Sequence, residues 1–139
     1  MSRHILAVDP GKATGMSYFV WESPDVEPVM VWSGEYQQHE YAAPIREAFL
    51  KCQTLGVTLE VVCERFTINA QTVKNSQAPY SLEQIGILKQ IMMDNGRSPD
   101  DIYFQSLKTP VAGKYRISFG LQHLCCQLFS QPAQLHSVH

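Results

Sequence analysis

The sequence predicts a single α/β domain in which helices flank a mixed sheet of five strands, three antiparallel strands followed by two parallel ones. Three observations predict this fold class. The length of 139 residues suits one domain of ordinary size. Strand-like and helix-like segments follow one another in the order β-β-β-α-β-α-β-α. Finally, 45% of the residues are hydrophobic and 17% are charged, which excludes a wholly disordered chain.

The first three elements are predicted strands. Residues 5–8 form an uninterrupted apolar run that ends at an Asp-Pro-Gly turn, as a central buried strand does. Residues 15–21 and 29–36 are rich in aromatic and β-branched side chains, and a Ser-Pro-Asp turn separates them. We expect these three strands to be antiparallel, with Asp9 at the carboxyl end of the first.

A helix and a fourth strand are predicted next. Residues 45–52 place apolar side chains at i, i+3, i+4 and i+7, and Gly56 follows where such a helix ends. Residues 57–64 return to strand character and close on an acid, Glu64. The chain therefore carries two carboxylates that each end a hydrophobic strand.

A second helix, a fifth strand and a third helix complete the predicted order. Ser81 and Gln84 have the spacing of a capping box, and an apolar face runs from Leu82 to Met92 before an Asn-Gly stop. Residues 102–107 are predicted to form the fifth strand. A weaker helical face follows at residues 121–128.

No apolar run approaches the roughly 20 residues that cross a bilayer, and the amino terminus lacks the apolar core of a signal peptide. We therefore expect a cytoplasmic protein. The four cysteines form no Cys-x-x-Cys pair, so we expect reduced thiols and no zinc site. They are Cys52, Cys63, Cys125 and Cys126.

The net charge of −2 gives no overall electrostatic footprint for nucleic acid, but the charges are unevenly placed. Residues 65–82 contain no acid while Arg65 and Lys74 lie among amide side chains, and no acid follows Asp101. Two interpretations stay open for these segments: solvated polar loops, or a surface that contacts nucleic acid.

Asp9 and Glu64 are predicted to emerge at the same edge of the sheet, because helical connections place their strands side by side. Two ionised carboxylates in one site repel each other, so that one pKa rises or a cation binds between them. Mg²⁺ prefers such oxygen ligands. The alternatives are a structural Asp-Pro-Gly turn, and a Glu64 paired with Arg65 or Lys12.

These residues carry a resemblance to a known family. Residues 5–15 (ILAVDPGKATG), residues 61–66 (VVCERF) and the order of elements resemble the RuvC-like Holliday junction resolvases of the RNase H-like superfamily, especially those encoded by phages. The resemblance covers roughly residues 3–114. It implies one RNase H-like nuclease domain over residues 1–139, with a carboxyl-terminal part that is atypical from about residue 115.

The resemblance also implies an activity. Members are metal-dependent endonucleases that cut branched DNA such as four-way junctions, usually as homodimers, here in a bacterial or phage-infected cytoplasm. Asp9 and Glu64 would be the catalytic residues and the ligands of Mg²⁺, with Mn²⁺ as a substitute, and the metal would activate a water for in-line attack on a phosphodiester.

Several cations and polar side chains are candidate DNA contacts. Lys12 and Thr14 lie beside Asp9, where an ammonium group and a hydroxyl would meet a phosphate, although a surface charge and a turn hydroxyl explain them equally well. The polar segment after Glu64 has the composition of a loop that binds the DNA backbone. The full candidate set is Lys12, Thr14, Arg65, Gln71, Lys74 and Lys114.

The carboxyl-terminal part departs from the family pattern. Members present an H-x-x-D or D-x-x-D pair in a final helix after a lysine that matches Lys114, whereas residues 117–139 contain no Asp or Glu and end in His136-Ser-Val-His139. We expect that the native carboxyl end was lost or replaced, for instance by a frame change near Tyr115, which an H-x-x-D stretch in another reading frame of the gene would support. If this end is authentic, we expect weak or absent activity.

Two other classes stay open. The Asp-x-Gly-x-x-Thr-Gly turn also resembles the phosphate-binding loop of sugar kinases and actin-like ATPases, although these need two such domains around the nucleotide. A non-catalytic DNA-binding or assembly protein on the same fold fits the missing terminal acids. Mg²⁺-dependent junction cleavage and ATP turnover would separate the three classes.

Overall fold

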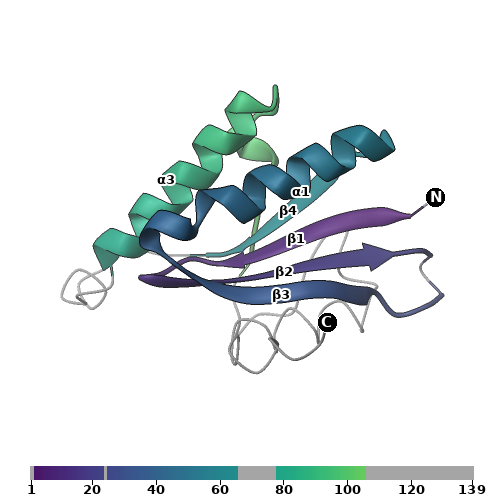
Figure 1. Cartoon of the computed structure of the whole chain (residues 1–139), viewed down its shortest axis with the longest axis horizontal. Coiled ribbons are helices and arrows are strands. Elements are labelled where there is room, and N and C mark those ends of the chain that lie inside the picture. The colour runs from purple at the N-terminus through teal and green to yellow at the C-terminus, as the bar shows by residue number, and fades with distance from the viewer. Residues whose placement is uncertain (1, 24, 66–77, 106–139) are drawn as a thin grey trace.

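The computed structural model describes residues 2–23, 25–65 and 78–105 of the chain. In this part, five strands and two α-helices follow the predicted order (Figure 1). The strands are β1 (Arg3–Asp9), β2 (Ala13–Trp21), β3 (Val29–Gln37), β4 (Leu59–Glu64) and β5 (Tyr103–Gln105), the α-helices are α1 (Ala42–Leu55) and α3 (Ala78–Asp94), and the 3₁₀ turns are η1 (Gln38–Glu40) and η2 (Pro99–Asp101).

The five strands form one mixed sheet in the order β3-β2-β1-β4-β5. β1, β2 and β3 pair antiparallel, whereas β4 pairs parallel with β1 on one side and with β5 on the other. The predicted fold class, three antiparallel strands followed by two parallel ones, is therefore confirmed. This order makes β1 the centre of the sheet and puts the predicted acid-bearing strands β1 and β4 next to each other.

Both α-helices lie on one face of the sheet (Figure 1). Alternate side chains of each strand point to that face, so Leu6 and Val8 of β1 and Val61 and Cys63 of β4 join the core beneath the helices. On the other face, Ile5, Ala7, Phe19 and Val62 are also fully buried. The apolar run of β1 thus matches a strand buried on both faces.

Helix α1 is the amphipathic helix that the spacing predicts. Its buried side chains are Ile45, Ala48, Phe49 and Cys52. It ends at Gly56, whose φ of 71° lies in the left-handed region and whose N–H donates to carbonyls of the last turn. Because a side chain in that conformation is strained, glycine suits this end of the helix.

A buried polar chain fastens α1 to the sheet. The hydroxyl of Tyr18 lies 2.6 Å from His4 Nδ1 and 3.2 Å from Cys52 Sγ. All three side chains are buried. Burial is the main cause that lowers the pKa of His4 and raises the pKa of Tyr18. Both side chains are therefore neutral at pH 7, and neither buries a charge.

The predicted capping box at the start of α3 is wrong. The helix begins at Ala78, three residues before Ser81, because Pro79 is tolerated in a first turn and lets the helix start earlier. Ser81 and Gln84 are both buried inside the helix, and the amide of Gln84 has no hydrogen-bond partner among the described residues. Leu82, predicted on the apolar face, is 43% exposed, since Ser81 takes its place toward the core.

Some predictions fall outside the described residues. These are the third helical face at residues 121–128, the cysteines Cys125 and Cys126, and the atypical part from residue 115. Cys52 and Cys63 are free thiols and buried, as predicted. Among the described residues, no helix is long and apolar enough to span a membrane.

Candidate metal and nucleic-acid site

The register between β1 and β4 brings the two predicted carboxylates together. The parallel pairing runs from His4 and Leu59 to Val8 and Cys63, so Asp9 and Glu64 are the next residues on neighbouring strands. Val8 and Cys63 point into the core under the helices. Because side chains alternate along a strand, Asp9 and Glu64 point together to the opposite face, at the carboxyl ends of both strands.

The surroundings of Asp9 disfavour its ionised form. Burial raises the pKa of Asp9 to about 9, and a hydrogen bond to Glu64 and repulsion from the Glu64 charge act in the same direction. Ala7 and Val62, the residues two positions earlier on the same face, are fully buried and supply part of this apolar surrounding. None of the causes is a cation, so the pair as it stands holds a proton in place of a second negative charge.

The donor set of this pair fits a hard divalent cation. Two carboxyl groups offer oxygen ligands only, and Mg²⁺ in proteins is commonly held by one or two carboxylates that leave positions for water and substrate phosphate. A cation between them would offset the repulsion between the two carboxylates, which is one of the causes that raise the pKa of Asp9. Among residues 2–23, 25–65 and 78–105, no cluster of three or more His, Cys, Asp or Glu side chains forms a fuller metal site.

The turn after Asp9 is held by its own side chains and by α3. Thr14 is fully buried; its hydroxyl donates to the Gly11 carbonyl at 3.1 Å and accepts the Gly11 N–H at 3.3 Å. Ser81 of α3 donates to the Pro10 carbonyl at 3.2 Å. The bonds of Thr14 therefore lie inside the turn, and its contact with DNA stays a prediction.

Two predicted DNA contacts lie at this edge with exposed side chains. Lys12 is in the turn that follows Asp9, and Arg65 comes directly after Glu64. The ammonium group of Lys12 lies 5.7 Å from the centre of the Tyr80 ring, in the first turn of α3. Tyr80 is a residue that the sequence reasoning missed, because nothing in the local pattern shows that α3 returns to the Asp9 turn.

The other candidate contacts lie outside the described residues. They are Gln71, Lys74 and Lys114. The terminal residues His136 and His139 lie outside them too.

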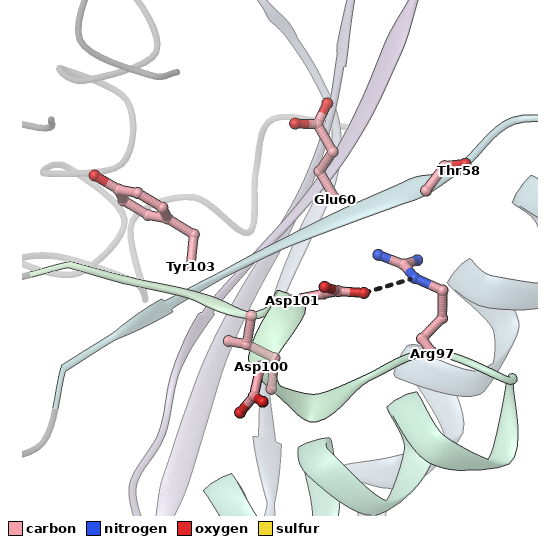
Figure 2. A pocket seen from close by; sticks show the side chains of 7 residues that line it. Thr58, Glu60, Arg97, Asp100, Asp101 and Tyr103 are labelled. Carbon is pink, nitrogen blue, oxygen red and sulfur yellow. Dashed lines mark ion pairs between the residues drawn. The ribbon is translucent and has the colours of Figure 1, made fainter. Parts of the chain in front are cut away.

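The cavity shown in Figure 2 lies at the other end of β4. It has a volume of about 370 Å³, and its lining includes Glu60 and Asp100. Arg97, another lining residue, pairs with Asp101 at 3.6 Å and donates to a backbone carbonyl of β4. Glu60, the lining acid on β4, pairs with Arg3 at 2.7 Å and lies near the start of the strand, whereas Glu64 ends it, so the cavity and the carboxylate pair are separate features.

Comparison with known proteins identifies the fold. No known family profile matches the sequence, and no curated protein matches it. Among solved structures, Thermus thermophilus RuvC in complex with a Holliday junction substrate matches 99% of this chain and 92% of its own, at 12% identity and a TM-score of 0.54.

A second structure of Thermus thermophilus RuvC matches 100% of this chain and 93% of its own chain, at 13% identity and a TM-score of 0.55. The predicted phage type stays a prediction at these identities. The whole-chain superposition and the strand order agree, and this chain has the RuvC-like form of the RNase H-like fold.

Proposed function

We propose that this protein is a Mg²⁺-dependent endonuclease that hydrolyses phosphodiester bonds in branched DNA, with Mn²⁺ as a substitute metal. One observation carries the proposal: the β1–β4 register aligns Asp9 and Glu64 on one face at the carboxyl ends of adjacent strands. The pKa of Asp9, raised to about 9, supports it because none of the causes of this shift among the described residues is a positive charge. A buried carboxyl pair that resists ionisation is a feature typical of functional sites.

In this proposal the side chains have distinct tasks. Asp9 and Glu64 bind the metal through their oxygens, and the rigid pairing of β1 with β4 keeps them aligned. When bound, the metal polarises the phosphodiester and activates a water for in-line attack. The bonds of Thr14 and Ser81 hold the turn that carries Asp9, so the carboxylate is positioned before the substrate arrives.

Branched DNA as the substrate is supported by the likeness to a RuvC that is solved with a Holliday junction. The exposed cations Lys12 and Arg65 flank the two acids, where they would meet the DNA backbone. The homodimer and the extension of one nuclease domain over the whole chain stay predictions.

One observation favours a second candidate, a junction-binding protein with weak or no nuclease activity. Residues 102–139 contain no Asp or Glu, so this segment offers no carboxylate to join Asp9 and Glu64. A pair of carboxylates holds a metal less tightly than a larger set does, and cleavage depends on that metal. The two candidates share the DNA surface and differ only in the cleavage step.

The test is cleavage of a labelled four-way junction and of a linear duplex of the same sequence, in Mg²⁺ and in EDTA. The wild type should cut the junction selectively and only with metal, and Asp9→Asn should lower the rate by more than about 10–100-fold. Asp100→Asn is the matched control, because it removes an exposed carboxylate at the other end of the sheet. Junction binding without cleavage would favour the second candidate, and neither binding nor cleavage would contradict both.

A further inference from the structure

The edge that carries Asp9 also holds an aromatic ring that no sequence motif singles out. Lys12 Nζ lies 5.7 Å from the centroid of the Tyr80 ring, within the distance at which a cation and an aromatic face attract each other. Lys12 is exposed and Tyr80 is half-buried, so the pair is open to solvent while the ring is anchored in α3.

The two residues are fixed relative to the carboxylate pair. Lys12 is three residues after Asp9 in a turn closed by the Thr14 hydroxyl. Tyr80 immediately precedes Ser81, whose hydroxyl donates to the Pro10 carbonyl of that same turn. Because both ends of the contact are bonded to one turn, the position of the Lys12 ammonium group follows the position of Asp9.

The charge of Lys12 remains available to an anion. In the part of the chain that the structure describes, the ion pairs involve Arg3, Arg46 and Arg97 and leave Lys12 out. The first turn of α3 contains no acidic residue, so no carboxylate there competes for the ammonium group. A ring holds a cation without neutralising its charge, in contrast to a carboxylate.

We propose that Lys12 and Tyr80 form a phosphate-binding site beside the carboxylate pair, in which Lys12 contacts a DNA backbone phosphate and Tyr80 is a positioning residue for its ammonium group. The inference rests on the proposed function, since the phosphate belongs to the branched DNA. A long lysine side chain loses rotamer entropy when it grips an anion, and the ring reduces that loss in advance.

The test is the salt dependence of junction binding, measured in Ca²⁺ or EDTA so that no cleavage occurs. Each phosphate contact contributes about 0.9 to the slope of log K against log salt concentration. Lys12→Gln should therefore flatten the slope by about 0.9. Tyr80→Leu should flatten it in the same direction, Tyr80→Phe should keep the wild-type slope because the ring remains, and the double variant Lys12→Gln/Tyr80→Leu should add nothing to Lys12→Gln.

A matched control separates position from net charge. Lys51 of α1 also lies over an aromatic ring, at 4.9 Å from that of Tyr18, but its charge acts on His4, near the end of β1 that is opposite to Asp9. Lys51→Gln removes the same charge and should leave the slope unchanged. If Tyr80→Leu loses its circular-dichroism melting transition, Tyr80→Gln, which suits a half-exposed site, takes its place.

The outcomes are distinct for the two proposals. Junction binding with the wild-type slope in Lys12→Gln overturns the phosphate site and leaves the nuclease proposal standing. A flattened slope in Lys12→Gln with additive effects of Tyr80→Leu overturns the positioning role of Tyr80. Absence of junction binding by the wild type overturns both proposals.

Discussion

The fold disfavours the ionised form of the Asp9 side chain. Burial, the bond to Glu64 and the charge of Glu64 all raise its pKa, to about 9, whereas an aspartate in an unfolded chain titrates near about 3.9. A raised pKa contributes stability that is complete below the unfolded value and is lost as the pH rises through the folded value. Between these two pH values the carboxyl ionises in the unfolded chain and stays protonated in the folded one, so it increasingly favours the unfolded chain as the pH rises.

The first prediction is that Asp9→Asn stabilises the metal-free protein. The amide has a similar shape and never ionises, so at about pH 8–9 in EDTA the free energy of unfolding should rise by about 1–3 kcal/mol. The gain should shrink as the pH falls and should vanish well below about pH 4, where the wild-type carboxyl is protonated in both the folded and the unfolded state. Thermal melts across this pH range measure it.

Asp100→Asn is the control for this prediction, because its exposed side chain should change stability by no more than about 0.5 kcal/mol at any pH. Equal melting temperatures for Asp9→Asn and the wild type at high pH would contradict the account of Asp9. A wild type that is stabilised by Mg²⁺ while Asp9→Asn is not would tie the same residue to the metal.

The sequence allowed the two acids and the cations beside them to be predicted, but not the contacts between α3 and the turn after Asp9. Asp9 and Glu64 were predictable because each ends an apolar strand, and strand ends are readable from local composition. Tyr80 and the bond from Ser81 to Pro10 were not, since both join segments about 70 residues apart in the chain. No local pattern reports such contacts.

The turn after β1 depends on α3 as an element. Ser81 is buried, and its hydroxyl donates to the carbonyl of Pro10, a buried residue that comes next after Asp9. The helix therefore supports the candidate site from beneath the sheet edge. This link explains why a polar residue occupies a position of α3 that faces the interior.

The second prediction is that Ser81→Ala destabilises the fold by about 1–3 kcal/mol, since it leaves the Pro10 carbonyl without its buried donor. Denaturant unfolding measures this loss. Thr54→Ala is the matched control, because its hydroxyl makes the same kind of bond, to the Leu50 carbonyl at 3.0 Å, on the exposed face of α1. A loss in Ser81→Ala no larger than in Thr54→Ala would contradict the supporting role.

The two helices were predictable to different degrees. The spacing of apolar residues placed α1, and Gly56 marked its end, because a left-handed residue is a local requirement. The start of α3 was predicted too late, since the capping-box pattern of Ser81 and Gln84 is also compatible with buried positions inside a helix. Tertiary packing, which local sequence does not encode, decided between the two.

For the whole molecule, the sheet order β3-β2-β1-β4-β5 is the property that creates the site. It places two strands that are about 50 residues apart in the chain beside each other in parallel register, with an acid at the end of each. At the other end of these two strands, Arg3 of β1 donates two hydrogen bonds to the Glu60 carboxylate of β4, both at 2.7 Å. The fold class was predictable because it follows from the order of elements, whereas the register had to be observed.

The central claim is that Asp9 and Glu64 together form a divalent-metal site, and calorimetric titration of Mg²⁺ or Mn²⁺ into the DNA-free protein tests it most directly. Because the metal must displace the proton held at Asp9, binding should release up to about one proton and tighten by up to about tenfold per pH unit between about pH 7 and 9. Two buffers with different heats of ionisation reveal the proton, and Asp100→Asn serves as the control. The account predicts this coupled binding in the wild type and its loss in Asp9→Asn, whereas equal, proton-free binding in both proteins would contradict it.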